Sequence, residues 1–64
     1  MKNLLKQKRQ EKKLTQPQLA NLLGFTNYQS LQAVELGKNI PSVELALRIA
    51  KALDCRVEDI FILE

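Results

Sequence analysis

Apolar side chains recur through most of the chain at the three- and four-residue spacing of a helix. A first helix, capped by Asn3, is expected to end near Lys12. A second helix begins at Thr15, whose hydroxyl is placed to form a capping box with Gln18. Pro17 fits the first turn of that helix, because a backbone N–H is not needed there. The chain therefore opens with two short helices.

A tight turn and a third helix follow. Gly24 ends the second helix as a left-handed cap, and the third helix is expected to be capped by Asn27 or Thr26. Leu31 and Val34 are its inward positions. A short helix, a tight turn and a second short helix have the layout of a helix-turn-helix.

The fourth helix is the most clearly amphipathic one and is expected to be capped by Ser42. Its predicted core positions are Val43, Ala46, Leu47, Ile49, Ala50 and Leu53. A fifth helical turn is expected around residues 58–61. These elements predict a compact, all-α, five-helix domain that occupies residues 1–64 as one unit.

The apolar character continues at the C-terminal end, through Ile60, Phe61, Ile62 and Leu63. On a protein this small these residues are expected to leave an apolar tip, which a homodimer contact would cover. The alternative is that this segment folds back on the core of its own chain.

Charge and composition narrow the functional classes. Residues 1–13 hold six Lys or Arg against one Glu, whereas residues 54–64 hold one Arg against four acidic residues. A molecule with a basic and an acidic end is expected to present one side to a polyanion, although ordinary charge scatter is the alternative. His is absent and Cys55 is the single cysteine, so we expect neither a disulfide within the chain nor a structural zinc site.

No cofactor and no catalysis are expected, since the chain has no His, no paired carboxylates in an apolar setting and no glycine-rich phosphate loop. It also has no apolar run near the roughly 20 residues that span a bilayer. The sequence therefore predicts a soluble, cytoplasmic protein without a membrane partner.

The outward side of the third helix is expected to carry Tyr28, Gln29, Gln32 and Ala33, which are all uncharged. An ordinary solvated face would carry Lys or Glu. Gln side chains can read base edges in DNA, because one amide can both donate to and accept from adenine. The alternative is a face that is merely polar. On the inward side, Glu35 is the expected partner of Arg9, whose guanidinium lies near the buried edge of the first helix.

Three separately spaced segments carry a family resemblance: LTQPQLANLLG at residues 14–24, VELGKNIPS at residues 34–42 and ALRIAKAL at residues 46–53. With them the chain resembles the Cro and phage-repressor, or Xre-like, family of helix-turn-helix regulators, from about Leu5 to Phe61. The resemblance implies a lambda-repressor-like domain that binds double-stranded DNA, usually as a dimer on a palindromic operator.

The resemblance also implies roles for individual residues. Gln16, at the start of the second helix, and Lys38 and Asn39, after the third, would contact phosphates, and Arg9 and Glu35 would form an inward ion pair. Asn27 and Ser30 are also expected at the DNA backbone, beside the base-reading positions.

This chain departs from the family pattern by one extra residue between Gly24 and Leu31. Alignment at Glu35 and Gly37 makes Tyr28, Gln29 and Gln32 the base readers, whereas alignment at Gly24 would give the set Asn27, Tyr28 and Leu31. The first is preferred because the second exposes Leu31 and buries Ser30. Lys13 and Asp54 stand where the family often has a helix-ending glycine.

Two functions are expected from this reading. The first is a small homodimeric transcriptional regulator, most simply a repressor. The second is a protein-interaction module, such as the antitoxin half of a toxin–antitoxin pair, in which the apolar C-terminal tip binds another protein.

Overall fold

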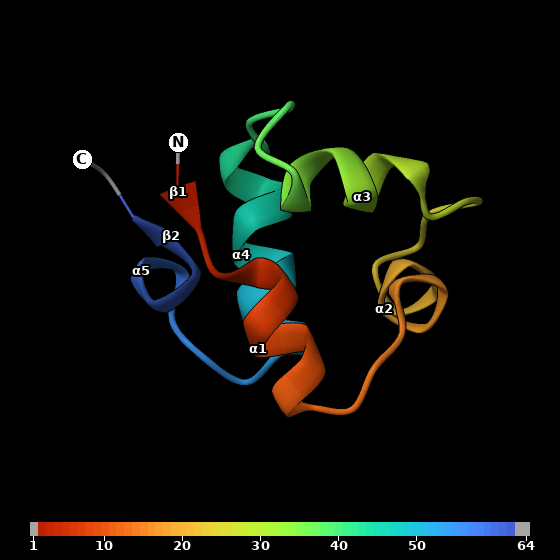
Figure 1. Cartoon of the computed structure of the whole chain (residues 1–64), viewed down its shortest axis with the longest axis horizontal. Coiled ribbons are helices and arrows are strands. Elements are labelled where there is room, and N and C mark those ends of the chain that lie inside the picture. Colours follow the sequence, from red (N-terminus) through yellow and green to blue (C-terminus); the bar gives the residue numbers. More distant parts are fainter. Residues whose placement is uncertain (1, 63–64) are drawn as a thin grey trace.

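The computed structural model describes residues 2–62 and is mostly helical (Figure 1). The elements, in chain order, are β1 (Lys2–Asn3), α1 (Leu5–Glu11), α2 (Gln16–Leu22), α3 (Gln29–Glu35), α4 (Val43–Ala52), α5 (Val57–Ile60) and β2 (Phe61–Ile62). The five predicted helices are all present, so the expected all-α architecture is confirmed. The two short strands were not predicted.

Each of the five helices contributes to one shared core, which is built almost entirely from aliphatic side chains. Its buried members are Leu5, Leu19, Ala20, Leu23, Leu31, Val34, Ala46, Ile49, Ala50, Leu53, Ile60 and Phe61. Removing these side chains from water supplies the main driving force for folding. The helices are short, so their stability depends on this packing.

Side chains fix the starts of two helices as expected. At α2 the Thr15 hydroxyl accepts a hydrogen bond from the Gln18 N–H (3.2 Å), and the Gln18 side chain accepts one from the Thr15 N–H (2.9 Å). At α4 the Ser42 hydroxyl accepts from the Leu45 N–H at 3.1 Å. These caps satisfy N–H groups that the helices leave without an internal partner.

Four helices end in the same way, with a residue in the left-handed region. The residue after the C-cap has a φ of 58° at Lys13, 85° at Gly24, 77° at Gly37 and 54° at Asp54. In each case the next N–H bonds back five residues to a carbonyl in the last turn, as Phe25 does to Ala20 at 3.0 Å. Lys13 and Asp54 thus adopt a conformation that suits glycine better.

The predicted core of α4 is wrong at two positions. Val43 is 77% exposed and Leu47 is 56% exposed, whereas Ala46, Ile49 and Ala50 are buried. Val43 and Leu47 lie one turn apart on a side of α4 that no other described element covers. The apolar stripe of the sequence is therefore wider than the side of the helix that reaches the core.

The expected apolar tip is wrong for Ile60 and Phe61, which are buried in the core of their own chain. β1 pairs antiparallel with β2, with Asn3 opposite Phe61, and the Leu4 N–H bonds to the Ile60 carbonyl at 2.7 Å. This pairing turns the C-terminal end back onto the domain, which was the alternative reading. Ile62 is half-buried, and Leu63 lies outside the described residues.

A buried ion pair joins α1 to α3, as predicted. Arg9 Nε donates to Glu35 Oε2 at 2.9 Å, and the two side chains are only 9% and 4% exposed. Arg9 Nη1 also donates to the Leu14 carbonyl (2.6 Å), and Gln16 Nε2 donates to Glu35 Oε1 (3.3 Å). Every buried side-chain nitrogen and oxygen within residues 2–62 has a hydrogen-bond partner, which a buried charge pair requires.

We expect Lys13→Gly and Asp54→Gly each to raise the free energy of unfolding by about 0.5–1 kcal/mol. The left-handed conformation costs a residue with a Cβ roughly 1–2 kcal/mol, and the greater freedom of glycine in the unfolded chain returns part of it. Thermal unfolding followed by circular dichroism measures the change. The reverse control is Gly24→Ala, whose added Cβ would meet Arg48 Nη2 at an ordinary 3.7 Å, so that only backbone strain lowers its stability. If Lys13→Gly and Asp54→Gly both lowered the free energy of unfolding, this explanation would be contradicted.

Arg9→Met is expected to lower the free energy of unfolding by about 3–5 kcal/mol, because it leaves the Glu35 carboxylate buried without its cation. The double variant Arg9→Met, Glu35→Leu should recover part of that loss. Lys8→Met is the matched control. Lys8 Nζ lies 3.9 Å from Glu11 Oε1 in a more exposed ion pair, and an exposed pair of this kind is worth about 0–1 kcal/mol. Urea denaturation tests all three, and equal losses at Arg9 and Lys8 would refute the structural role of the buried pair.

Candidate nucleic-acid interface

The outward side of α3 is uncharged and accessible. Tyr28, Gln29, Ser30 and Gln32 are exposed and Ala33 is half-buried, whereas Leu31 and Val34 are buried on the other side. Tyr28 occupies the N-cap position, so the helix itself begins at Gln29. The predicted cap at Asn27 or Thr26 is therefore wrong, although Asn27 Oδ1, one residue before the N-cap, accepts from the Gln29 N–H at 3.2 Å.

Burial of Leu31 distinguishes between the two possible sets of base readers. Leu31 is 0% exposed and Ser30 is exposed, so a set that includes Leu31 has no accessible side chain at that position. The set Tyr28, Gln29 and Gln32 remains on the surface. The Glu35 side chain, at the end of the same helix, is only 4% exposed, as the alignment at Glu35 and Gly37 expects.

Gln16 is tied to the buried ion pair. It stands at the first position of α2 and is half-buried, and its amide donates to Glu35 Oε1. Arg9, Lys13, Gln16, Pro17 and Tyr28 all line one shallow groove. The groove therefore brings the start of α2 next to the start of α3. The sequence identified Gln16 but not its bond to Glu35, and the only local signal for that bond is its place at the helix start.

The loop after α3 lies at the other end of the same helix (Figure 1). Lys38 and Asn39 are both exposed, and their N–H groups bond to the Ala33 carbonyl at 2.9 and 3.3 Å. The helix end thus holds the backbone of this loop while both side chains face solvent. Residues that are candidates for contacts to the DNA backbone therefore lie at both ends of α3.

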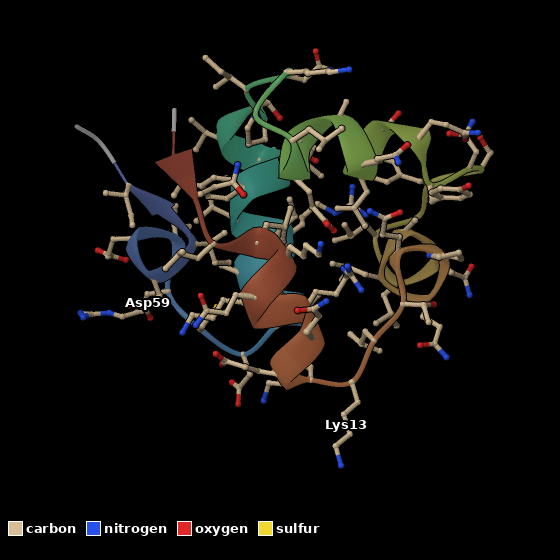
Figure 2. All side chains as sticks on the ribbon, in the orientation of Figure 1. Lys13 and Asp59 are labelled. Carbon is tan, nitrogen blue, oxygen red and sulfur yellow. The ribbon has the colours of Figure 1, made fainter. Side chains whose placement is uncertain are left out.

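The pairing of β1 with β2 places the two chain ends side by side, although most of the basic residues of the first thirteen lie further along, on α1 and just after it. Burial raises the pKa of the Cys55 thiol, Asp59 raises it further and Lys8 lowers it, so charges of both ends surround one side chain. Figure 2 shows Asp59 on α5 and Lys13 after α1 on different sides of the molecule. The acidic helix α5 lies away from α2 and from the start of α3 (Figure 1).

Other kinds of site find no support in the part of the chain that the structure describes. Residues 2–62 contain no group of three or more His, Cys, Asp or Glu placed to hold a metal ion. None of the helices described there is long and apolar enough to cross a membrane.

Comparison with known proteins agrees with this geometry. Residues 5–60 match the helix-turn-helix family. The whole chain is 48% identical over 64 residues to an uncharacterized HTH-type transcriptional regulator of Methanocaldococcus jannaschii, of which it covers 96%. It is 46% identical over 65 residues to one of Methanothermobacter thermautotrophicus (93% covered) and 41% identical over 64 residues to YgzD of Bacillus subtilis (96% covered).

The matched residues 5–60 span all five helices of the fold, including α2, the turn and α3. The chain therefore belongs to the Cro/C1-type, Xre-like family of helix-turn-helix transcriptional regulators, which are DNA-binding proteins.

Proposed function

We propose that this protein is a sequence-specific repressor that binds double-stranded DNA as a homodimer on a palindromic operator, in the cytoplasm and without cofactor or catalysis. The observation that carries the proposal is the uncharged outward side of α3, which presents Gln29 and Gln32 while Leu31 and Val34 anchor the helix in the core. An α-helix fits the major groove of B-DNA, where each base pair displays a distinct pattern of donors and acceptors.

The residues of this side have separate tasks. Gln29 and Gln32 read bases, since a Gln amide bonds adenine at N6 and N7 together. Tyr28 contacts a thymine methyl or a phosphate, and half-buried Ala33 lets the helix approach the base pairs closely. Specificity comes from these contacts, and Gln29 contributes most because it lies in the first turn of the helix.

Contacts to the DNA backbone set the position of α3. Gln16 and Lys38 bind phosphates on either side of the groove, and Asn39, Asn27 and Ser30 add hydrogen bonds from the turns and from α3. The bond from Gln16 to Glu35 supports this role, because it fixes the amide beside the groove that Tyr28 also lines. Such contacts supply affinity without regard to sequence.

A second copy of the chain provides the second reading helix, with half-sites about 34 Å apart. Support for a homodimer comes from exposed apolar side chains at Ile40, Val43 and Leu47. Val43 and Leu47 share one side of α4, and Ile40 lies three residues before that helix begins. Ile60 and Phe61 are already buried, so the dimer contact moves from the C-terminal end to this surface. A bound dimer represses most simply by blocking access to the DNA beneath it.

A protein-interaction module of the antitoxin type is the second candidate. Exposed Leu22 lines a recess with Arg48 and Lys51, and this surface favours a partner that is both apolar and acidic. A neighbouring reading frame for a small toxin would support this function. A homodimer by sedimentation without a bound partner would count against it.

In vitro selection from random duplex DNA tests the proposal, together with Gln29→Ala and Lys38→Ala. We expect a palindromic motif for the wild type. Gln29→Ala should lose about 1–3 kcal/mol of binding free energy and relax the preference at one base pair, whereas Lys38→Ala should weaken all sequences alike and reduce the salt dependence. Gln7→Ala, which changes an exposed side chain of α1, is the control. No enrichment at moderate salt would overturn the function, and an unchanged motif for Gln29→Ala would overturn the assignment of that reader.

The double variant Val43→Ser, Leu47→Ser tests the dimer surface. Because both side chains are largely exposed, the fold should persist while the dimer dissociates more readily in sedimentation. Affinity for the full palindrome should fall, and affinity for one half-site should not. Leu22→Ser removes exposed apolar surface from α2 and serves as the control. A wild type that stays monomeric at every concentration, or an unaffected double variant, would refute this surface.

A further inference from the structure

Asn3 connects three parts of the fold through a single residue. Its backbone lies in β1 opposite Phe61 of β2. Its side-chain Oδ1 accepts from the Leu5 N–H at 3.2 Å, at the start of α1. Its Nδ2 donates to the Val34 carbonyl at 2.9 Å, across 31 positions of sequence, in the last turn of α3. The sequence predicted Asn3 as the cap of the first helix, but Leu4 holds the N-cap position of α1, and neither side-chain bond of Asn3 is an N-cap bond.

The Val34 carbonyl lies where α3 ends. It also accepts from the Gly37 N–H at 3.0 Å in the turn that ends the helix. Lys38 and Asn39 follow at once, so the bond from Asn3 acts on the junction between the reading helix and the backbone-contacting loop. The Arg9–Glu35 pair holds the same turn of α3 through a side chain. Two separate attachments, one to a side chain and one to the backbone, restrict rotation and tilt of the helix.

Helix capping alone does not account for Asn3. The bond from the Leu5 N–H uses Oδ1 only, and Ser or Asp would supply an equivalent acceptor. The donor that reaches Val34 is a distinct feature of the Asn amide. Because Asn3 is half-buried, that donor has lost part of its access to water, and the bond to Val34 satisfies it.

We propose that Asn3 is a positioning residue for DNA recognition, which couples the paired strands at the chain ends to the orientation of α3. This inference rests on the proposed function. Asn3 does not touch DNA. It holds the C-terminal turn of α3 so that Gln29 and Gln32 meet the bases while Lys38 and Asn39 meet the backbone.

Asn3→Ser tests the proposal, because serine keeps an acceptor for the Leu5 N–H and its shorter side chain does not reach Val34. Binding is measured with two duplexes of equal length, one carrying the site selected by the wild type and one with that site scrambled, at a temperature where circular dichroism shows every variant to be folded. We expect affinity for the selected site to fall about threefold to tenfold, as loss of one hydrogen bond implies, and affinity for the scrambled duplex to stay constant. Hydrogen exchange at the Gly37 and Lys38 amides should accelerate.

Two variants complete the design. Asn3→Asp keeps the acceptor and loses the donor, so the ratio of its affinity for the selected duplex to that for the scrambled duplex should fall as in Asn3→Ser. Its added negative charge should lower the affinity for both duplexes alike. Ser42→Ala is the matched control, since it removes one side-chain hydrogen bond at the start of α4. It should lower the melting temperature and leave the affinity ratio unchanged.

The outcomes separate the inference from the function beneath it. A wild-type protein that prefers no sequence would overturn the proposed function and the role of Asn3 in recognition together. A wild type that prefers its selected site, with the same affinity ratio in Asn3→Ser, would overturn the role of Asn3 alone. An affinity ratio that falls equally in Ser42→Ala would also overturn it, because the effect would then follow stability.

Discussion

The ion pair between Arg9 and Glu35 is the interaction on which the arrangement of the first three helices depends. Its groups come from α1 and α3, and its remaining hydrogen bonds come from the Leu14 carbonyl and the Gln16 amide. Two buried charges are tolerated only when all of these partners are in place. A displacement of α1, α2 or α3 would therefore leave a charge without its partner. A cluster of aliphatic side chains could repack in several ways, whereas a guanidinium and a carboxylate bond well only in a few planar arrangements, here through Arg9 Nε and Nη2.

The same pair determines which side of α3 faces solvent. With Glu35 held inside, Leu31 lies one turn earlier on the same side and Val34 lies beside it, and both are buried. Gln29 and Gln32 must then point outward. The proposed base reading by α3 therefore relies on a charge pair in the interior of the domain.

Local features of the fold were predictable from the sequence, whereas tertiary ones were less so. Thr15, Ser42 and Gly24 act within one turn of their own helix, so their residue types suffice to locate helix ends. Arg9 and Glu35 were also found, because a buried charge demands a partner of opposite sign. The exposure of Val43 and Leu47 was not predicted, because the apolar stripe of a helix does not indicate how much of that stripe a small core can cover.

The chain ends were the hardest part to predict. A strand of two residues has no periodicity, so the pairing of β1 with β2 left no signal in the sequence, and without it Ile60 and Phe61 read as an exposed tip. The long-range bond of Asn3 depends on that pairing. At the candidate site, the residue types alone predicted an uncharged outward side of α3. Which residues lie on that side could be decided only once Leu31 was known to be buried.

The outward side of α3, held by the buried pair, is the surface that we propose meets the bases of DNA. Titration of the ¹⁵N-labelled protein with a duplex selected from random sequences tests this most directly. The side-chain amide signals of Gln29 and Gln32 and the backbone signals of Gln16, Lys38 and Asn39 should shift, and those of α5 should stay in place. Shifts centred on α5 or on the exposed side of α4, with α3 unchanged, would contradict the account.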